Sequence, residues 1–181
     1  MLHLFSNESL KDFLDRNKIN LKREIESTED SYLLTVTEKD FVNYLISKYS
    51  FEAITLCEKG ITQKQEEIRL NGYEKSTPLN PTMLTGKIQL TINIPFEGNS
   101  HLFHCRPSKS LYQLPSGKVE IEHQNKRVKL EYELDNQKTD ITKDLIFQDI
   151  ENLKRWLVLV NDDLAIHNYW IKEKVRELTK P

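Results

Sequence analysis

The C-terminal segment carries one uninterrupted apolar pattern, which constrains the fold more than any other feature of the chain. From about Thr139 to Thr179 no Pro or Gly occurs, and apolar side chains and one His recur at alternating spacings of four and three residues. This is the a/d pattern of a heptad helix, formed by Ile146, Ile150, Leu153, Leu157, Val160, Leu164, His167 and Ile171. At about 1.5 Å per residue the helix would be about 60 Å long, roughly twice the width of a compact domain of this size. It must therefore bend, project or find a partner.

The predicted helix carries more apolar surface than a two-stranded seam needs. Trp156 and Trp170 lie two heptads apart on one flank, and Leu145, Leu159 and Ile166 lie on the next. We expect one side of the helix to pack on a sheet of the same chain, and the other side, around the two Trp, to be open to a second element or chain. The predicted partner interface consists of Trp156, Leu157, Val160, Leu164, His167, Trp170 and Ile171. Burial of both Trp within the same chain is the competing explanation.

The composition is that of a folded domain without a membrane segment. The chain has 181 residues, enough for one domain, or for one domain plus an extended helix. Charged residues make up 30%, and no apolar run approaches the length of about 18 residues that a transmembrane helix needs. Met1–Ser6 shows no signal peptide, and Cys57 and Cys105 stand far apart, as reduced thiols would. We therefore expect a cytoplasmic protein.

Strands are predicted in the second half of the chain. Between Ile88 and Phe96 apolar and polar residues alternate, as in an antiparallel strand with one buried face. A turn at Glu97–Asn99 should lead into a return strand at Leu102–Arg106. Val119–His123 and Val128–Leu134 alternate in the same way. Together they predict a meander of four or five strands, with one face free for the long helix to cover.

Helices are predicted for the first part of the chain. Ser6 is expected to cap a short amphipathic helix, and Leu21 and Ile25 mark a second, charge-rich one. Thr37 is expected to cap a third helix over Glu38–Lys48, because Thr at this position can accept a hydrogen bond from the first turn.

Two further segments complete the predicted fold. Phe51–Cys57 is expected to be a strand, and Asn71–Gly86 a long loop. The predicted class is α+β: an antiparallel meander sheet with N-terminal helices and a long C-terminal helix. Residues 1–138 form the α+β domain, and residues 139–181 form the amphipathic helix, which packs on the domain and is free to project beyond it.

Two blocks of the sequence resemble a bacterial protein family. Gly86–Ser108 reads GKIQLTINIPFEGNSHLFHCRPS, and Leu33–Tyr49 reads LLTVTEKDFVNYLISKY. Both are similar to the uncharacterised N-terminal region of bacterial proteins that continue into restriction-endonuclease-like or other antiviral defence effector domains. In that family the IPF-x-G…LF…PS block precedes a long helix, and the effector follows. The resemblance implies a sensor, scaffold or assembly module of an anti-phage defence system.

No catalytic constellation accompanies this resemblance. A nuclease of the restriction-endonuclease class needs an acidic residue followed by an acidic-x-Lys pair, and here no Asp or Glu has Lys two positions later. A Gly-rich phosphate loop, a G-x-S-x-G elbow and an H-E-x-x-H motif are also absent from the sequence. His101, His104 and Cys105 could suggest a metal, but adjacent strand residues such as His104 and Cys105 face opposite sides. We therefore predict no enzyme activity, metal or cofactor.

A local excess of positive charge follows His104, although the net charge of the chain is -2. Strand ends and a hairpin turn would display these cations together, either as a solvated turn or as a phosphate-contacting patch. The residues are Arg106, Lys109, Lys118, Lys126, Arg127 and Lys129.

Two functions therefore stay open. The first is a non-enzymatic interaction, sensor or scaffold module that forms a homodimer or binds an effector protein through its C-terminal helix. The alternative is a nucleic-acid-binding domain that uses the basic hairpin. They differ in where the binding free energy lies, in the Trp flank of the helix or in the basic turn.

Overall fold

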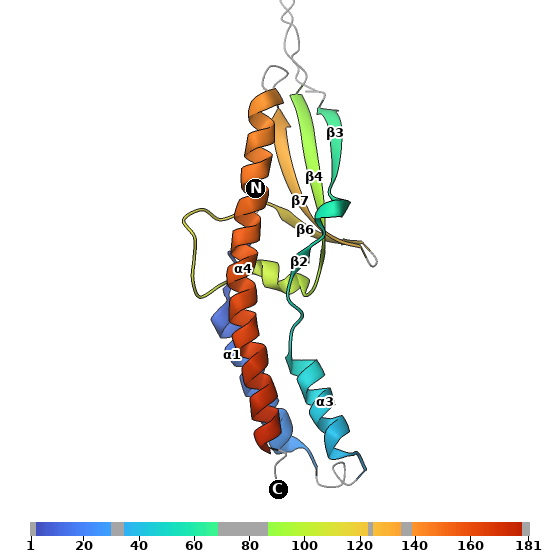
Figure 1. Ribbon diagram of the computed structural model, residues 1–181, viewed down its shortest axis with the longest axis vertical. Coiled ribbons are helices and arrows are strands. Elements are labelled where there is room, and N and C mark those ends of the chain that lie inside the picture. The colour runs from blue at the N-terminus through green and yellow to red at the C-terminus, as the bar shows by residue number, and fades with distance from the viewer. Residues whose placement is uncertain (1–2, 30–34, 69–86, 123–124, 135–138, 179–181) are drawn as a thin grey trace, which may run out of the picture.

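The structure is a computed structural model that describes residues 3–29, 35–68, 87–122, 125–134 and 139–178. The described chain has the predicted α+β class, with three α-helices and a mostly antiparallel sheet. The helices are α1 (Leu10–Ser27), α3 (Glu38–Tyr49) and α4 (Thr139–Leu178). The molecule is elongated, and α4 runs along its whole length (Figure 1). The sheet lies beside the N-terminal half of α4, and α1 and α3 lie beside the C-terminal half.

The main sheet has the order β2-β4-β7-β6, and β3 also pairs with β4, on the same edge as β2. Its strands are β2 (Thr55–Leu56), β3 (Thr62–Ile68), β4 (Lys87–Glu97), β6 (Lys118–Glu122) and β7 (Asn125–Leu134). A short parallel pair joins β1 (Glu8–Ser9) to β5 (Cys105–Arg106). The 3-10 turns η1 (Glu58–Gly60) and η2 (Ser100–His104) follow β2 and β4.

The alternating apolar residues of β4 form the inner face of the sheet. Ile92 lies opposite Leu130 of β7, and Ile94 lies opposite Val128. All four side chains are 4% exposed or less. They belong to one core cluster with Leu153 and neighbouring apolar residues of α4. The prediction that β4, β7 and the long helix share a core is confirmed.

A second, smaller core holds the three helices together. Leu21 of α1, Leu45 and Tyr49 of α3, and Ile171 and Val175 of α4 are all buried there. The heptad seam of α4 therefore continues from the sheet into a helical layer of the same chain. Over the described residues, α4 is packed on both cores rather than projecting from one.

Two Asn side chains of α4 bind the extended segment between α3 and β2. Asn161 accepts from the amide of Ile54 at 3.0 Å and donates to its carbonyl oxygen at 2.8 Å. Asn168 makes the same two bonds with Phe51, at 3.1 and 2.8 Å. The spacing of seven residues places both amides on one side of the helix. They satisfy backbone groups that the sheet does not reach.

The N-terminal helices differ from the prediction. Residues expected in two helices form the single helix α1, because no Gly or Pro interrupts the segment. Ser9, not Ser6, is its cap, and the Ser9 hydroxyl accepts from the amide of Asp12 at 3.3 Å. The predicted cap of α3 is confirmed, since Thr37 accepts from the amide of Asp40 at 3.2 Å.

The predicted strands also need correction outside β4, β6 and β7. The expected return strand at Leu102–Arg106 is mostly η2, and its last two residues form β5. The Asn99 side chain accepts from the amide of His101 at 3.0 Å and thereby starts a 3-10 turn instead of a hairpin. Only Thr55 and Leu56 of the strand expected at 51–57 pair with β4. The loop predicted at 71–86 lies outside the described residues.

Candidate functional site

Most residues of the predicted partner interface lie in the core of the chain itself. Trp156, Leu157, Val160, Leu164, His167 and Ile171 are each 4% exposed or less. Trp170 is partly buried in the smaller core, and the Lys18 ammonium of α1 lies 5.4 Å from the centre of its ring. The expectation of an open flank around the two Trp is therefore wrong. Elements of the same chain cover this flank, as in the competing explanation.

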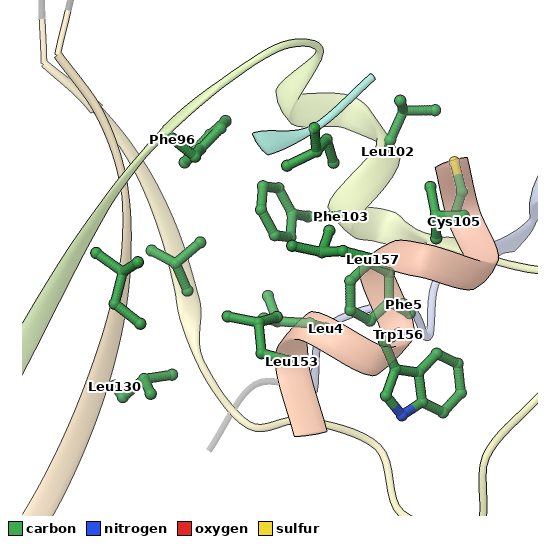
Figure 2. Packing of buried hydrophobic residues seen from close by; sticks show 14 of the residues in the cluster. Leu4, Phe5, Phe96, Leu102, Phe103, Cys105, Leu130, Leu153, Trp156 and Leu157 are labelled. Carbon is green, nitrogen blue, oxygen red and sulfur yellow. The ribbon is translucent and has the colours of Figure 1, made fainter. Parts of the chain in front are cut away.

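Trp156 shows how the flank is covered. Its ring stacks on Phe5 with a centroid distance of 5.5 Å and an interplanar angle of 7°. Its indole N–H donates to the carbonyl oxygen of Gln113 at 2.8 Å. Figure 2 shows Trp156 and Phe5 beside Leu4 and Leu153 in the core. The N-terminal segment and the loop after β5 therefore occupy the place that was predicted for a partner.

His167 is the one polar side chain of the seam that is buried among the described residues, at 2% exposed. Its Nε2 lies 3.0 Å from the side-chain oxygen of Asn17 and 3.1 Å from the carbonyl oxygen of Tyr49. Because both are acceptors, Nε2 carries the proton, and the buried Nδ1 has no partner in the described chain. Burial lowers the pKa of His167 below its usual 6.5; the Lys18 charge adds to the effect, whereas the Tyr49 carbonyl and Asp15 oppose it. His167 is therefore a packed, hydrogen-bonded histidine of the core rather than a residue of an open interface.

This geometry predicts a pH dependence of stability. An unfolded His takes up a proton near pH 6.5, whereas buried His167 resists protonation until a lower pH. The contribution of His167 is therefore complete above about pH 7.5, and it decreases as the pH falls through 6.5 towards the lower pKa of the folded state. Denaturant unfolding at about pH 7.5 and 5.5 should show this loss in wild type and a smaller loss in His167→Gln. Equal losses in the two proteins would contradict the assignment.

Three of the six predicted nucleic-acid-binding residues converge on one carboxylate. Glu120 of β6 lies 3.2 Å from the ammonium of Lys118, 2.5 Å from that of Lys129 and 3.5 Å from the guanidinium of Arg127. The hydrogen bonds from Lys129 and Lys118 lower the pKa of Glu120 to about 2, although partial burial opposes them. Glu120 is therefore ionised at neutral pH and neutralises part of the predicted patch.

The other three cations have different surroundings. Lys126 donates to the carbonyl oxygen of Gly98 at 2.7 Å, which ties the hairpin to the turn after β4. Arg106 lies on β5, and exposed Lys109 follows Ser108, which binds Asp163 of α4 with bonds of 2.6 and 2.7 Å. Four of the six residues thus lie on the β6–β7 hairpin, whereas Arg106 and Lys109 lie on and after β5. Nucleic-acid binding stays a prediction. It has less support than the sequence alone suggested, because Glu120 pairs with three of the six cations.

α4 also carries exposed apolar residues that lie outside its heptad seam. Phe147, Val158, Ile166 and Tyr169 are between 58% and 71% exposed. We refer to these four residues as the outer face of α4. This face lies off the heptad seam and was not predicted. Its signal in the sequence is the recurrence of Phe147, Val158 and Tyr169 at intervals of 11 residues.

A cluster of possible metal ligands lies where β1 meets β5. One oxygen (Oε1) of Glu8 is 2.8 Å from His101 Nε2 and 3.9 Å from Cys105 Sγ, and the three donor atoms all lie within 4.8 Å of one another. The other oxygen (Oε2) of Glu8 pairs with the guanidinium of Arg16. Burial, and then the charge of Glu8, raise the pKa of the Cys105 thiol to about 12. His101 and Cys105 are close in the sequence, but no local pattern links them to Glu8, which lies 93 residues before His101.

Comparisons of the chain with protein-family models, curated proteins and solved structures found no match. Among the described residues, no helix combines the length and the apolar character needed to span a membrane.

Proposed function

We propose that the protein is a non-enzymatic interaction module that self-associates through the outer face of α4. The observation that carries the proposal is the exposure of four large apolar side chains on one helix whose opposite side is fully used by the core. Apolar side chains grouped on one surface are typical of interaction sites, whereas single ones are ordinary. The helix remains the predicted interaction element, but the opposite side of it makes the contact.

The spacing of the outer face favours a second copy of this chain as the occupant. Eleven residues make about three turns of helix, so Phe147, Val158 and Tyr169 form a nearly straight line along α4. The two aromatic residues are equally far from Val158. An antiparallel pair with its two-fold axis at Val158 would place Phe147 of each copy opposite Tyr169 of the other. A self-complementary surface of this kind is what a two-fold dimer requires.

Charged residues beside the line from Phe147 to Tyr169 are consistent with the same two-fold axis at Val158. Arg155 lies three residues before Val158, and Asp162 lies four residues after it. Both side chains are exposed, and their separation of seven residues places them on the same flank of the line. In the antiparallel pair, Arg155 of each copy would lie opposite Asp162 of the other. Two such pairs would favour this register over parallel alignment.

The resemblance of the Gly86–Ser108 and Leu33–Tyr49 blocks supplies the proposed setting. We place the module in a bacterial anti-phage defence system, where pairing through α4 would bring two copies of an effector together. The setting predicts a defence nuclease or another effector in the same or a neighbouring reading frame. The genomic sequence around the gene tests it independently of the dimer.

Sedimentation velocity of the full chain tests the dimer. Wild type should form dimers at about 100 µM. Val158→Asp should raise the dissociation constant at least about tenfold, because a charge would lie at the centre of the interface. Ile121→Asp is the matched control, since Ile121 is similarly exposed, at 55% against 58%, but belongs to β6 and not to α4. The control should associate like wild type.

A charge exchange tests the antiparallel register. Arg155→Asp should weaken the dimer, because each new Asp would face Asp162 of the other copy. The double variant Arg155→Asp, Asp162→Arg should restore association by reversing both partners. A monomeric wild type at about 100 µM, or a Val158→Asp protein that associates like wild type, would contradict self-association. Failure of the double variant to recover would contradict the register.

A further inference from the structure

We propose that Glu8, His101 and Cys105 form a binding site for a zinc ion. The three residues supply a carboxylate oxygen, an imidazole nitrogen and a sulfur, a donor set that suits Zn²⁺. Magnesium and calcium prefer oxygen ligands, so the thiol and the imidazole disfavour both. This site is separate from the outer face of α4, and its proposal does not depend on the dimer.

The backbone holds the three donors together. Glu8 and Cys105 are direct partners in the parallel pair of β1 and β5. His101 lies one turn earlier, in η2, where its carbonyl oxygen is 3.6 Å from the Cys105 sulfur. Figure 2 shows Cys105 at the margin of the core, with its sulfur directed away from Trp156. The thiol therefore lies at the border between the core and the side chains of half-buried Glu8 and exposed His101.

The donor distances are close to those that zinc requires. Bonds of about 2.0–2.3 Å in a tetrahedron place ligand atoms roughly 3.3–3.8 Å apart. The separation of 3.9 Å between the Glu8 oxygen and the Cys105 sulfur is near this range, and the 2.8 Å between Glu8 and His101 must widen. The widening is sterically easy, because the His101 side chain is 47% exposed. Small side-chain rotations therefore suffice.

Arg16 acts on the carboxylate from outside the site. It holds one oxygen of Glu8 and leaves the other directed at His101 and Cys105. Partners of this kind orient metal ligands in many proteins. The positive charge of Arg16 lowers the affinity of the site for a cation. Zinc binding opposes this effect, because it converts the neutral Cys105 thiol into a negatively charged thiolate. When the sulfur–zinc bond forms, the S–H proton leaves to solvent, and the imidazole proton is carried by Nδ1 so that Nε2 can bind.

The fourth position of the tetrahedron is open. Glu8 and His101 line a hollow of about 310 Å³ together with Phe13, Arg16, Asn17 and Asn20. Three protein ligands and an accessible fourth position distinguish such a site from a closed structural zinc site. The fourth ligand would be water, or a donor group from a bound partner.

Titration of the full chain with Co²⁺, an optical substitute for Zn²⁺, tests the site. Wild type should develop a thiolate-to-cobalt charge-transfer band in the near ultraviolet, and Zn²⁺ should abolish it by displacement. Cys105→Ser should lack the band, whereas Cys57→Ser should keep it, because Cys57 is the other thiol of the chain and lies outside the cluster. Absence of the band in wild type at about 1 mM Co²⁺ would overturn the proposal.

Two further variants keep the test valid if loss of the buried Cys105 thiol disturbs folding. His101→Gln changes an exposed side chain and should weaken Co²⁺ binding at least about tenfold. His104→Gln is its matched control, because the His104 ring lies 6.1 Å from that of His101 but its nitrogens are not in the cluster. The control should bind like wild type. Unchanged affinity in His101→Gln, or an equal loss in both variants, would overturn the assignment.

Discussion

Replacing Ile92 with Asp is expected to unfold the protein. Ile92 is 4% exposed and lies between β3 and β7, opposite Gln63 and Leu130. A carboxylate placed there has no cationic partner in the core and costs several kcal/mol. A domain of this size has a total free energy of unfolding of about 5–15 kcal/mol. Circular dichroism and denaturant unfolding should therefore show a largely unfolded chain.

Asn93→Asp is the matched control for this substitution. Asn93 is the next residue of β4 and lies on the outer face of the sheet, opposite Lys129 in the strand register. Its side-chain oxygen is buried without a hydrogen-bond partner among the described residues, and it shares a hollow with the cationic side chains of Lys129 and Arg127. A carboxylate beside these cations should therefore destabilise the protein clearly less than one in the apolar core. A native melting temperature for Ile92→Asp would contradict the assignment of the two faces. So would equal destabilisation by both substitutions.

The elements of the fold that were predicted correctly are those in which apolar residues recur at the regular spacing of a strand or a helix. The alternation of Ile92, Asn93 and Ile94 is visible because one side of β4 is buried and the other is polar. The seam of α4 is visible for the same reason at helical spacing. β3 escaped prediction because its TQKQEEI sequence is polar on both faces. Charged residues suit it as an edge strand, which must not pair with other chains.

The heptad seam of a helix does not identify the surface that packs against it. A heptad pattern requires an apolar surface against the helix, but it does not say whether that surface belongs to the same chain. Here Trp156 stacks on Phe5, which lies 151 residues earlier in the chain. No local sequence pattern indicates that contact. The prediction of an interface at Trp156 was therefore wrong, although the burial of an apolar surface was correctly expected.

Polar contacts over long sequence separations were also not predictable. Asn161 and Asn168 look like solvent-exposed residues of a helix, yet each binds a backbone segment more than 100 residues earlier. The same holds for Glu8, which the pairing of β1 with β5 brings to Cys105. A local pattern gave the elements, whereas their mutual positions depend on contacts that only the folded chain shows.

The second large effect is expected for Trp156→Ala. Trp156 is 1% exposed, stacks on Phe5 and donates to Gln113, so the substitution removes a large buried ring and leaves a cavity. Trp-to-Ala substitutions in a core cost about 3–5 kcal/mol, and the unpaired carbonyl of Gln113 adds to this unless water reaches it. Trp156→Phe should cost less, because it retains an aromatic ring against Phe5 but loses the hydrogen bond.

Comparison with Val158→Ala separates stability from association. Val158 lies two residues later on α4, but it is 58% exposed, so its truncation should change the free energy of unfolding by less than about 0.5 kcal/mol. Denaturant unfolding should therefore distinguish a strongly destabilised Trp156→Ala from a nearly unchanged Val158→Ala. If Trp156→Ala keeps the stability of wild type and instead abolishes association, the indole is at an intermolecular surface. In that case the seam of α4 faces a partner, as the heptad pattern first suggested, and the outer face is not the interface.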